Sequence, residues 1–350
     1  MRIAGIDLLC PACREGLRER EQGRALVCEH CGRRFPVLLG IPDLRLEPDP
    51  YIDFDADRAK GEEVERRSRG LGFAETIDLY YSMTSVVTAG QARQFAAAMG
   101  AAADRAAELL ESTWESSADA HGERFLDLGC GTAPLLASAR GFDQRVGVDI
   151  AFRWLVVGRK RLAELGLEAP LVCACAESLP FPDESFDAIG AASSLEVVRR
   201  QDDAVSESCR VLRVGAPLLV ETPNRWSLGP DPHVGLWAGG WLPDRVIARY
   251  IARRGGIPPE RRLFSARRLS GLLRESGFRR VRVWAPAVPV SAVRERFGGI
   301  AGAVAAAYNG SRSLPLAGTL TTLVSPLLRA TARRAGAAVP ADSPLRSTAG

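Results

Sequence analysis

The sequence predicts an α/β protein with a doubly wound parallel sheet, preceded by a cysteine-rich module and a helical segment. From residue 125 onward, short apolar runs alternate with helical patterns, as in βαβ units. The first run leads into a glycine pair in "FLDLGCGTAP", residues 125–134, where backbone N–H groups can approach a cofactor closely. Two C-x-x-C pairs near the N-terminus predict the separate module.

The N-terminal cysteines have the spacing of a metal site. In "CPACREGLREREQGRALVCEHC", 14 residues separate the pair Cys10 and Cys13 from the pair Cys28 and Cys31. Two such knuckles can close a tetrahedron of thiolates around Zn²⁺, and unligated thiols would not need this double spacing. A ribbon of this length cannot bury a sizeable core. The bound metal would therefore have a structural role and would supply the free energy that folds the ribbon. We expect His30 to be exposed; a site of three cysteines and His30 is the alternative.

A helical segment follows the ribbon. The stretches "DADRAKGEEVERRSRGLGFAETIDLYYSM" and "AGQARQFAAAMGAAADRAAELLEST" are rich in helix-forming residues, and their charged face is expected to be solvated. Tyr80 and Tyr81 fit core positions better than a lid over a cofactor.

The βα alternation can be followed element by element. The successive elements read "RFLDLG", "PLLASARG", "RVGVDI", "RWLVVGRKRLAELGL", "LVCACA", "SFDAIGAA", "DDAVSESCRVLRVG" and "APLLVETPN". Ligands of such sheets bind at the carboxyl ends of the strands, near the point where the strand order reverses. We therefore expect the binding site beside the loop after the first strand.

The loop itself argues against a dinucleotide. A dinucleotide fingerprint needs a third glycine where this chain has Pro134. Asp127, at the strand end, would repel a pyrophosphate but suits a cationic ligand. Asp149 ends the second strand, 18 residues after Gly131, and can accept hydrogen bonds from ribose hydroxyls.

The D-x-G-x-G pattern resembles class I S-adenosylmethionine-dependent methyltransferases of the type 11 group. "AESLPFPDESFDAI" matches a stretch of that family almost residue by residue, and "SSLEVV", "RVLRVGAPLLVETPN" and "FSARRLSGLLRESGFRRVRV" follow in the family order over residues 120–285. The resemblance implies a Rossmann-like fold and S-adenosylmethionine as cofactor. It implies cofactor binding by Asp127, Gly129, Cys130, Gly131, Thr132, Asp149, Ile150, Cys175, Ala176 and Glu177.

Two positions depart from the family pattern. Ala133 replaces the third loop glycine, which is tolerable if its φ is negative. Cys175 stands where the family has an aspartate for the adenine amino group, and a thiol is a poor acceptor. The backbone of Ala176, or Glu177, could substitute for that aspartate.

The ribbon has a resemblance of its own. Its C-P-x-C start and its "GIPDL" ending are similar to the small zinc-ribbon activator subunit of tRNA and release-factor methyltransferases. Related ribbons precede some rRNA guanine methyltransferases. Residues 1–50 hold eight Arg and eight acidic residues, which weakens a general nucleic-acid-binding role for the ribbon.

The segment after the fifth strand is the best guide to the methyl acceptor. "TPNRWSLGPDPHVGLWAGGWLP", residues 222–243, is a long irregular loop with three Trp. His233 is a candidate base and Arg225 could hold an anionic group, while Trp226 and Trp237 could wall a pocket. Alternatively, His233 caps a turn and the Trp side chains only pack the insertion.

These observations favour methyl transfer to a small or lipid-like metabolite. The alternative is a zinc-ribbon methyltransferase of rRNA or tRNA, and a third hypothesis is a non-catalytic binding module with a damaged cofactor loop. Residues 241–350 hold 19 Arg against five acidic residues, which suggests an anionic acceptor, RNA or a membrane surface as partner. Arg also fills nearly every cationic position, since Lys occurs only at Lys60 and Lys160, so a solvated surface is the favoured explanation of the charge.

The chain is expected to divide into successive parts. "MRIAGIDLLCPAC" lacks a signal-peptide pattern and "GGIAGAVAAAYNG" is too short to span a bilayer, so we expect a cytoplasmic enzyme without a transmembrane segment. Peripheral membrane contact stays open. The expected parts are a zinc ribbon (1–46), a helical cap or linker (47–119), a methyltransferase core (120–290) with an insertion (224–264), a C-terminal helix and final strand (291–334) and a disordered tail (335–350).

Overall fold

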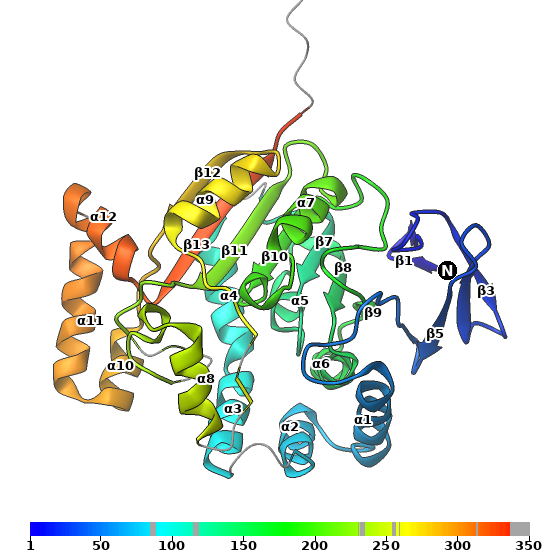
Figure 1. Cartoon of the computed structure of the whole chain (residues 1–350), viewed down its shortest axis with the longest axis horizontal. Coiled ribbons are helices and arrows are strands. Elements are labelled where there is room, and N and C mark those ends of the chain that lie inside the picture. Colours follow the sequence, from blue (N-terminus) through cyan, green and yellow to red (C-terminus); the bar gives the residue numbers. More distant parts are fainter. Residues whose placement is uncertain are drawn as a thin grey trace, which may run out of the picture.

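The structure of the chain is a computed structural model (Figure 1). It describes residues 1–84, 89–114, 119–229, 231, 235–253, 257, 258, 260–312 and 314–336. The expected base His233 and nearly all of the expected tail lie outside these residues.

The predicted parallel sheet forms the centre of the molecule. Its strands are β7 (Gly122–Leu128), β8 (Phe142–Asp149), β9 (Leu171–Cys173), β10 (Ala188–Ala192), β11 (Pro217–Pro223), β12 (Phe278–Trp284) and β13 (Leu327–Arg334). Their order in the sheet is β12-β13-β11-β10-β7-β8-β9. Neighbours from β9 to β11 pair in parallel, whereas β13 runs antiparallel between β11 and β12. The order reverses between β7 and β10, which predicts a ligand site at their carboxyl ends.

Helices connect the strands as the alternation predicted. They are α5 (Pro134–Ser138), α6 (Phe152–Glu164), α7 (Gln201–Val211) and α9 (Ala266–Glu275), with short 3₁₀ turns η1 (Leu195–Val197) and η2 (Gly239–Trp241). Right-handed crossovers on the two sides of the switch point place these helices on opposite faces of the sheet. In Figure 1, α7 and α9 lie in front of the sheet.

The N-terminal ribbon docks on the β9 end of the sheet (Figure 1). It consists of β1 (Arg2–Ile3), β2 (Ile6–Asp7), β3 (Leu17–Arg20), β4 (Ala25–Cys28), β5 (Arg34–Leu38) and β6 (Ile41–Pro42). The Leu9 N–H donates to the Pro180 carbonyl at 2.9 Å, and buried Phe35 and Leu44 belong to the same apolar cluster as the sheet. Sharing that cluster makes up for the small core that a ribbon has alone.

The first two helices of the helical segment pack against α6, and the fourth packs against α5. The helices of this segment are α1 (Phe54–Arg67), α2 (Phe73–Ser82), α3 (Ala89–Gly100) and α4 (Ala102–Thr113). Tyr80 is buried, and its ring lies 4.2 Å from that of Trp154 on α6. It is a core residue, as we expected.

Helices also leave the sheet after β11 and β12. They are α8 (Asp244–Ala252) in the insertion and α10 (Val290–Phe297), α11 (Gly299–Ser311) and α12 (Pro315–Val324) before β13. The described part of 291–334 thus holds three helices and a strand, where we expected one helix and a strand. The glycine and proline residues between them break the apolar stretch into short helices; Gly298, for example, has φ +90°.

Candidate active site

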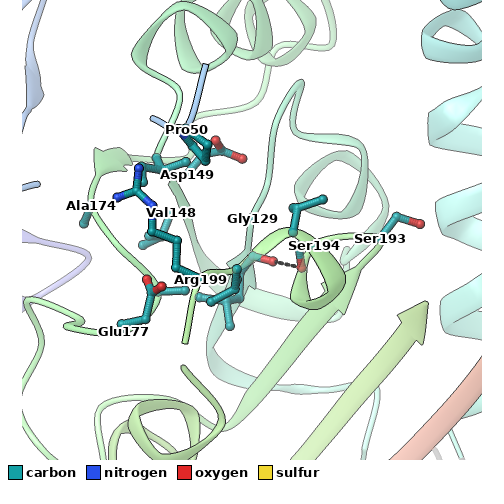
Figure 2. A pocket seen from close by; sticks show the side chains of 14 residues that line it. Pro50, Gly129, Val148, Asp149, Ala174, Glu177, Ser193, Ser194 and Arg199 are labelled. Carbon is teal, nitrogen blue, oxygen red and sulfur yellow. Dashed lines mark hydrogen bonds between the residues drawn. The ribbon is translucent and has the colours of Figure 1, made fainter. Parts of the chain in front are cut away.

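A cavity of about 140 Å³ opens where the strand order reverses, at the carboxyl ends of the central strands. It is lined by Pro50, Leu128, Gly129, Val148, Asp149, Ile150, Ala174, Ala176, Glu177, Ser193, Ser194, Val197, Val198 and Arg199 (Figure 2). Five residues predicted to bind the cofactor are among them: Gly129, Asp149, Ile150, Ala176 and Glu177. The site that the sequence predicted and this cavity therefore coincide in position.

The loop after β7 turns sharply at two glycines. Gly129 has φ +76°, and a Cβ there would lie 2.3 Å from the Cβ of Ser194, so only glycine fits. Ser194 in turn donates to the Leu128 carbonyl at 2.7 Å, the dashed line in Figure 2. Gly131 has φ +48°, but a Cβ there would meet open space. A bound molecule can therefore approach the backbone closely at Gly131.

Asp149 at the end of β8 fixes this loop. Its Oδ2 accepts the Gly131 N–H at 2.8 Å, and its Oδ1 accepts the Ala151 N–H at 2.8 Å. Burial raises the pKa of Asp149, although both backbone donors oppose the shift. Each carboxylate oxygen has a further lone pair, so Asp149 can also accept hydrogen bonds from a ligand in the cavity.

Asp127 lies behind the cavity wall. Its side chain is buried, and its Oδ2 has no hydrogen-bond partner among the described residues. Burial and the charge of Asp149 raise the pKa of Asp127 well above its ordinary value, while the Leu136 N–H partly opposes this. An unsatisfied buried acceptor is costly, so this position fits a carboxylate that is completed by a cationic donor.

The other loop residues face away from the cavity. The buried Cys130 sulfur lies against β8, where a Cβ added at Gly147 would come 2.8 Å from it, and burial raises the pKa of Cys130 well above its ordinary value. The Thr132 carbonyl accepts a hydrogen bond from Arg161 Nε of α6 at 2.8 Å. Cys130 and Thr132 thus hold the loop against β8 and α6 and do not line the cavity.

Ala133 does not meet the condition under which an alanine is easily tolerated in place of the third loop glycine. Its φ is +61°, in the left-handed region, and not negative. This conformation costs an alanine about 1–2 kcal/mol. The turn is held by a hydrogen bond from the Ala133 N–H to the Cys130 carbonyl at 2.7 Å and leads directly into α5.

The structure does not bring Cys175 to the cavity wall. Its buried thiol lies 3.7 Å from the carbonyl oxygen of Glu47, to which it can donate, and burial raises its pKa. The next residues, Ala176 and Glu177, do line the cavity. At the family's adenine-binding position, the side chain of Cys175 therefore points toward the N-terminal part of the chain.

A segment before α1, residues 46–50, crosses the edge of the cavity; we call it the strap. Pro50 of the strap lines the cavity, and Glu47 pairs with Arg199 at 2.8 Å and with Arg200 at 2.7 Å. Those two pairs hold the pKa of Glu47 below its ordinary value. Sequence reasoning missed the strap and Arg199, because nothing in the local pattern indicates that Glu47 and Arg199 meet.

Behind the strap lies a buried network of ion pairs. Arg45 pairs with Asp43 and Asp57, each at 2.7 Å, and all three side chains are fully buried. Asp57 also pairs with Arg153 at 2.7 Å and accepts the Phe152 N–H at 2.8 Å, at the N-terminus of α6. The network joins the ribbon, α1 and the turn after Asp149, so it supports the cavity from outside.

The predicted zinc ligands gather in the ribbon. The sulfur atoms of Cys10, Cys13, Cys28 and Cys31 all lie within 4.8 Å of one another. Hydrogen bonds from the backbone of Cys31, more than those from His30, lower the pKa of Cys28 to about 7. His30 is exposed and is not part of the cluster.

The residues expected to contact the acceptor lie after β11. Arg225 is exposed, with its guanidinium 5.1 Å from the ring centre of Trp226, which in turn lies 5.0 Å from that of Trp241. Trp237 is exposed as well. None of these side chains lines the cavity described above, and His233 lies outside the described residues.

Comparison with known proteins decides the family. Residues 126–220 match the family model described as "Methyltransferase domain". The ubiquinone/menaquinone biosynthesis C-methyltransferase UbiE of Laribacter hongkongensis is 34% identical over 175 residues, which cover 46% of this chain and 68% of that protein. The chain belongs to the class I S-adenosylmethionine-dependent methyltransferases.

Other members of this methyltransferase family are similar over a comparable span. The UbiE protein of Bordetella parapertussis is 32% identical over 189 residues, covering 50% of this chain and 70% of that protein. Among solved structures, phosphoethanolamine N-methyltransferase 2 of Haemonchus contortus, in complex with S-adenosyl-L-methionine, matches with a TM-score of 0.45 and 17% identity. That match covers 67% of this chain and 53% of that structure. The family model and the UbiE relatives show that the protein is an S-adenosylmethionine-dependent methyltransferase, and methyl transfer requires an acceptor substrate.

Proposed function

We propose that the enzyme methylates a lipid-like acceptor of the quinone-precursor class. The observation that carries this proposal is the 34% identity to a ubiquinone/menaquinone biosynthesis C-methyltransferase over two thirds of that relative. Exposed Trp237 and Trp241 after β11 are in keeping with an apolar acceptor. The scattered Arg residues of the C-terminal third do not require an anionic acceptor.

Three features in and beside the cavity fit S-adenosylmethionine. Open space beside Gly131 allows a ligand to lie against the backbone, and Asp149 can accept hydrogen bonds from ribose hydroxyls. Asp127 Oδ2, a buried acceptor without a partner among the described residues, suits the ammonium group of the methionine end. We propose that Ala176 and Glu177 adjoin the adenine. The side chains of Cys130, Thr132 and Cys175 would not contact the cofactor, and these residues would contribute to its binding only through the backbone of their loops.

S-adenosylmethionine supplies an already activated methyl group, so the protein mainly has to align the acceptor and exclude water. The strap contributes to the exclusion of water, because Pro50 forms part of the cavity wall and Glu47 ties the strap to Arg199. A base is required only if the acceptor keeps its proton at working pH. We propose His233 for that role; His233→Gln should lower kcat and change its pH profile, whereas His30→Gln in the ribbon should change neither.

Product identification tests the acceptor class. Purified enzyme is incubated with methyl-labelled S-adenosylmethionine and, separately, with the lipid extract, the water-soluble metabolites and the RNA of the same cells. We expect label in the lipid extract. Label confined to water-soluble metabolites would contradict a lipid-like acceptor, and label in RNA would favour the alternative of an RNA methyltransferase.

We also propose structural zinc at Cys10, Cys13, Cys28 and Cys31. Zn–S bonds of about 2.3 Å in a tetrahedron give S···S distances of about 3.8 Å. The distances of 3.6 Å between Cys10 and Cys31 and 3.4 Å between Cys13 and Cys28 are close to that value. All four positions are taken by thiolates, which leaves no open position for catalysis.

Metal analysis tests the zinc site. The purified protein should contain about one zinc per chain, and the double variant Cys28→Ala/Cys31→Ala should lose it and melt at a lower temperature. Cys209→Ala, which removes a half-buried cysteine outside the cluster, should retain the metal. Unchanged zinc in the double variant would refute the assignment.

The division of the chain into 1–46, 47–119, 120–290 and 291–334 is likewise proposed. It is supported by the change of element types at these boundaries. Limited proteolysis followed by mass spectrometry of the fragments would test it.

A further inference from the structure

The C-terminal helices expose an unusual amount of apolar side chain. Between Gly299 and Ser311, α11 contains no charged residue, and neither does α12 between Pro315 and Val324. Ile300 is 86% exposed and Val304, one helical turn later on the same face, is 64% exposed. Leu320 of α12 is 64% exposed, and Leu323 is exposed three residues further on. We call these four side chains the apolar face.

Hydrogen bonds attach α11 firmly to the segment that follows β12. Tyr308 donates its hydroxyl hydrogen to the Pro286 carbonyl at 2.9 Å, and Asn309 exchanges two hydrogen bonds with the backbone of Val288, at 3.0 and 2.9 Å. A Cβ at Gly302 would lie 2.8 Å from the Cβ of Arg294, so α10 and α11 are in close contact. Ile300 and Val304 are therefore held outward by a fixed helix.

The insertion after β11 adds to this exposed apolar surface. The Trp237 ring lies 6.1 Å from that of Phe297 at the end of α10. On α8, Val246 is exposed together with Arg245 and Arg249. Apolar side chains mixed with arginines are typical of segments that lie in the interface of an anionic membrane.

Topology puts this surface on the cofactor side of the sheet. The insertion begins where β11 ends, and α10 follows the carboxyl end of β12. Leu327, the first residue of β13, pairs with Pro223, the last residue of β11. The apolar helices therefore leave and rejoin the sheet at the edge that carries the cavity, at the end of the sheet opposite the ribbon (Figure 1).

We propose that the apolar face docks on a bilayer surface containing anionic lipids, from which the enzyme takes its acceptor. This proposal deepens the proposed function, on whose lipid-like acceptor it rests. Among the described residues, no helix is long and apolar enough to cross a membrane, so contact would be at the interface. The exposed Arg245 and Arg249 on α8 favour anionic headgroups and disfavour a second copy of the same surface.

Vesicle flotation of the full chain tests the docking directly, without turnover. The probes are phosphatidylcholine vesicles with and without phosphatidylglycerol. The wild type should float preferentially with the anionic vesicles, and Ile300→Glu/Val304→Glu should reduce its partition coefficient by about tenfold or more. Leu165→Glu/Val214→Glu, at positions 51% and 54% exposed on the core, is the matched control and should bind like the wild type.

The outcomes of these experiments distinguish failure of the docking proposal from failure of the proposed acceptor class. Calorimetric binding of S-adenosylmethionine, measured for every variant, should be unchanged and shows that each variant is folded. Absence of flotation, or an equal loss in both double variants, would overturn the docking proposal while leaving the labelled-lipid experiment to judge the acceptor. A further outcome would also overturn the proposal: the wild type self-associates without binding vesicles, and only Ile300→Glu/Val304→Glu abolishes the self-association. That result would assign the apolar face to a second copy of the chain.

Discussion

Arg45 and Asp57 form a fully buried ion pair, with Arg45 Nη1 2.7 Å from Asp57 Oδ2. The same nitrogen lies 2.9 Å from the carbonyl oxygen of Ile150, the cavity residue that follows Asp149. Through this pair, residues far apart in the sequence set the position of the turn after Asp149, the residue that holds the loop following β7.

The pair makes Asp57 a critical residue for stability. Asp57→Ala should lower the free energy of unfolding by about 3–5 kcal/mol, because it leaves the charges of Arg45 and Arg153 buried without this partner. Urea unfolding followed by circular dichroism measures the change. Asp55→Ala, which removes a 95% exposed carboxylate from the same helix, should cost less than about 0.5 kcal/mol. Equal losses in the two variants would contradict the role given to the network.

Gly131 should matter for cofactor binding more than for folding. Gly131→Val puts a branched side chain into the open space beside the loop and should weaken S-adenosylmethionine binding by about tenfold or more. Gly166→Val is the matched control, because Gly166 also has a positive φ, +65°, and faces open space, but lies in the turn after α6. Both variants should lose about 1–2 kcal/mol of stability from the left-handed backbone. Calorimetric titration in which both variants bind like the wild type would place the cofactor elsewhere.

Asp127 should lower the stability of the cofactor-free protein but strengthen the binding of S-adenosylmethionine. Asp127→Asn keeps the shape of the side chain, and should weaken S-adenosylmethionine binding if the carboxylate meets the ammonium group. In the absence of cofactor, the variant should be more stable at neutral pH by roughly 1–3 kcal/mol, because it removes the cost of ionising a buried group.

The raised pKa of Asp127 determines how its effect on the free energy of unfolding changes with pH. The folded-state pKa of Asp127 is raised, so the folded state binds the proton more tightly than the unfolded state. Its contribution to stability is fully present below the ordinary value of 3.8 and is lost as the pH rises through the raised pKa. The advantage of Asp127→Asn should therefore vanish in acid and grow with pH in thermal unfolding experiments. A constant advantage would mean that Asp127 does not titrate as inferred.

Cys175→Asp should destabilise the protein. An aspartate here would be buried and would face the Glu47 carbonyl, an acceptor that cannot pair with a carboxylate. We expect a loss of about 1–3 kcal/mol in unfolding free energy and weaker binding of S-adenosylhomocysteine, whereas Cys175→Ser should bind much as the wild type does. Tighter binding by the Asp variant would instead put residue 175 beside the adenine, as the family pattern implies.

The sequence was a good guide wherever the relevant residues are neighbours in the chain. Apolar runs and turn residues located β7 to β11 and their helices, and the glycines with Asp149 located the loop beside the cavity. Contacts between distant segments could not be predicted in this way. The pairing of Glu47 with Arg199, and the orientation of Cys175 toward the strap, depend on how the ribbon docks. The left-handed Ala133 reflects the tight turn into α5, which overrides the residue's own preference.

The docking of the ribbon also protects the end of the sheet. β9 (Leu171–Cys173) is the last strand on its side, and a bare strand edge invites pairing with other chains. Here the chain covers that edge itself, because Asp43 bridges to Cys173 and the Leu44 N–H donates to the Cys173 carbonyl at 2.7 Å. A methyltransferase core cut free of residues 1–46 would expose backbone donors and acceptors beside an apolar strand, and would be prone to aggregation through that edge.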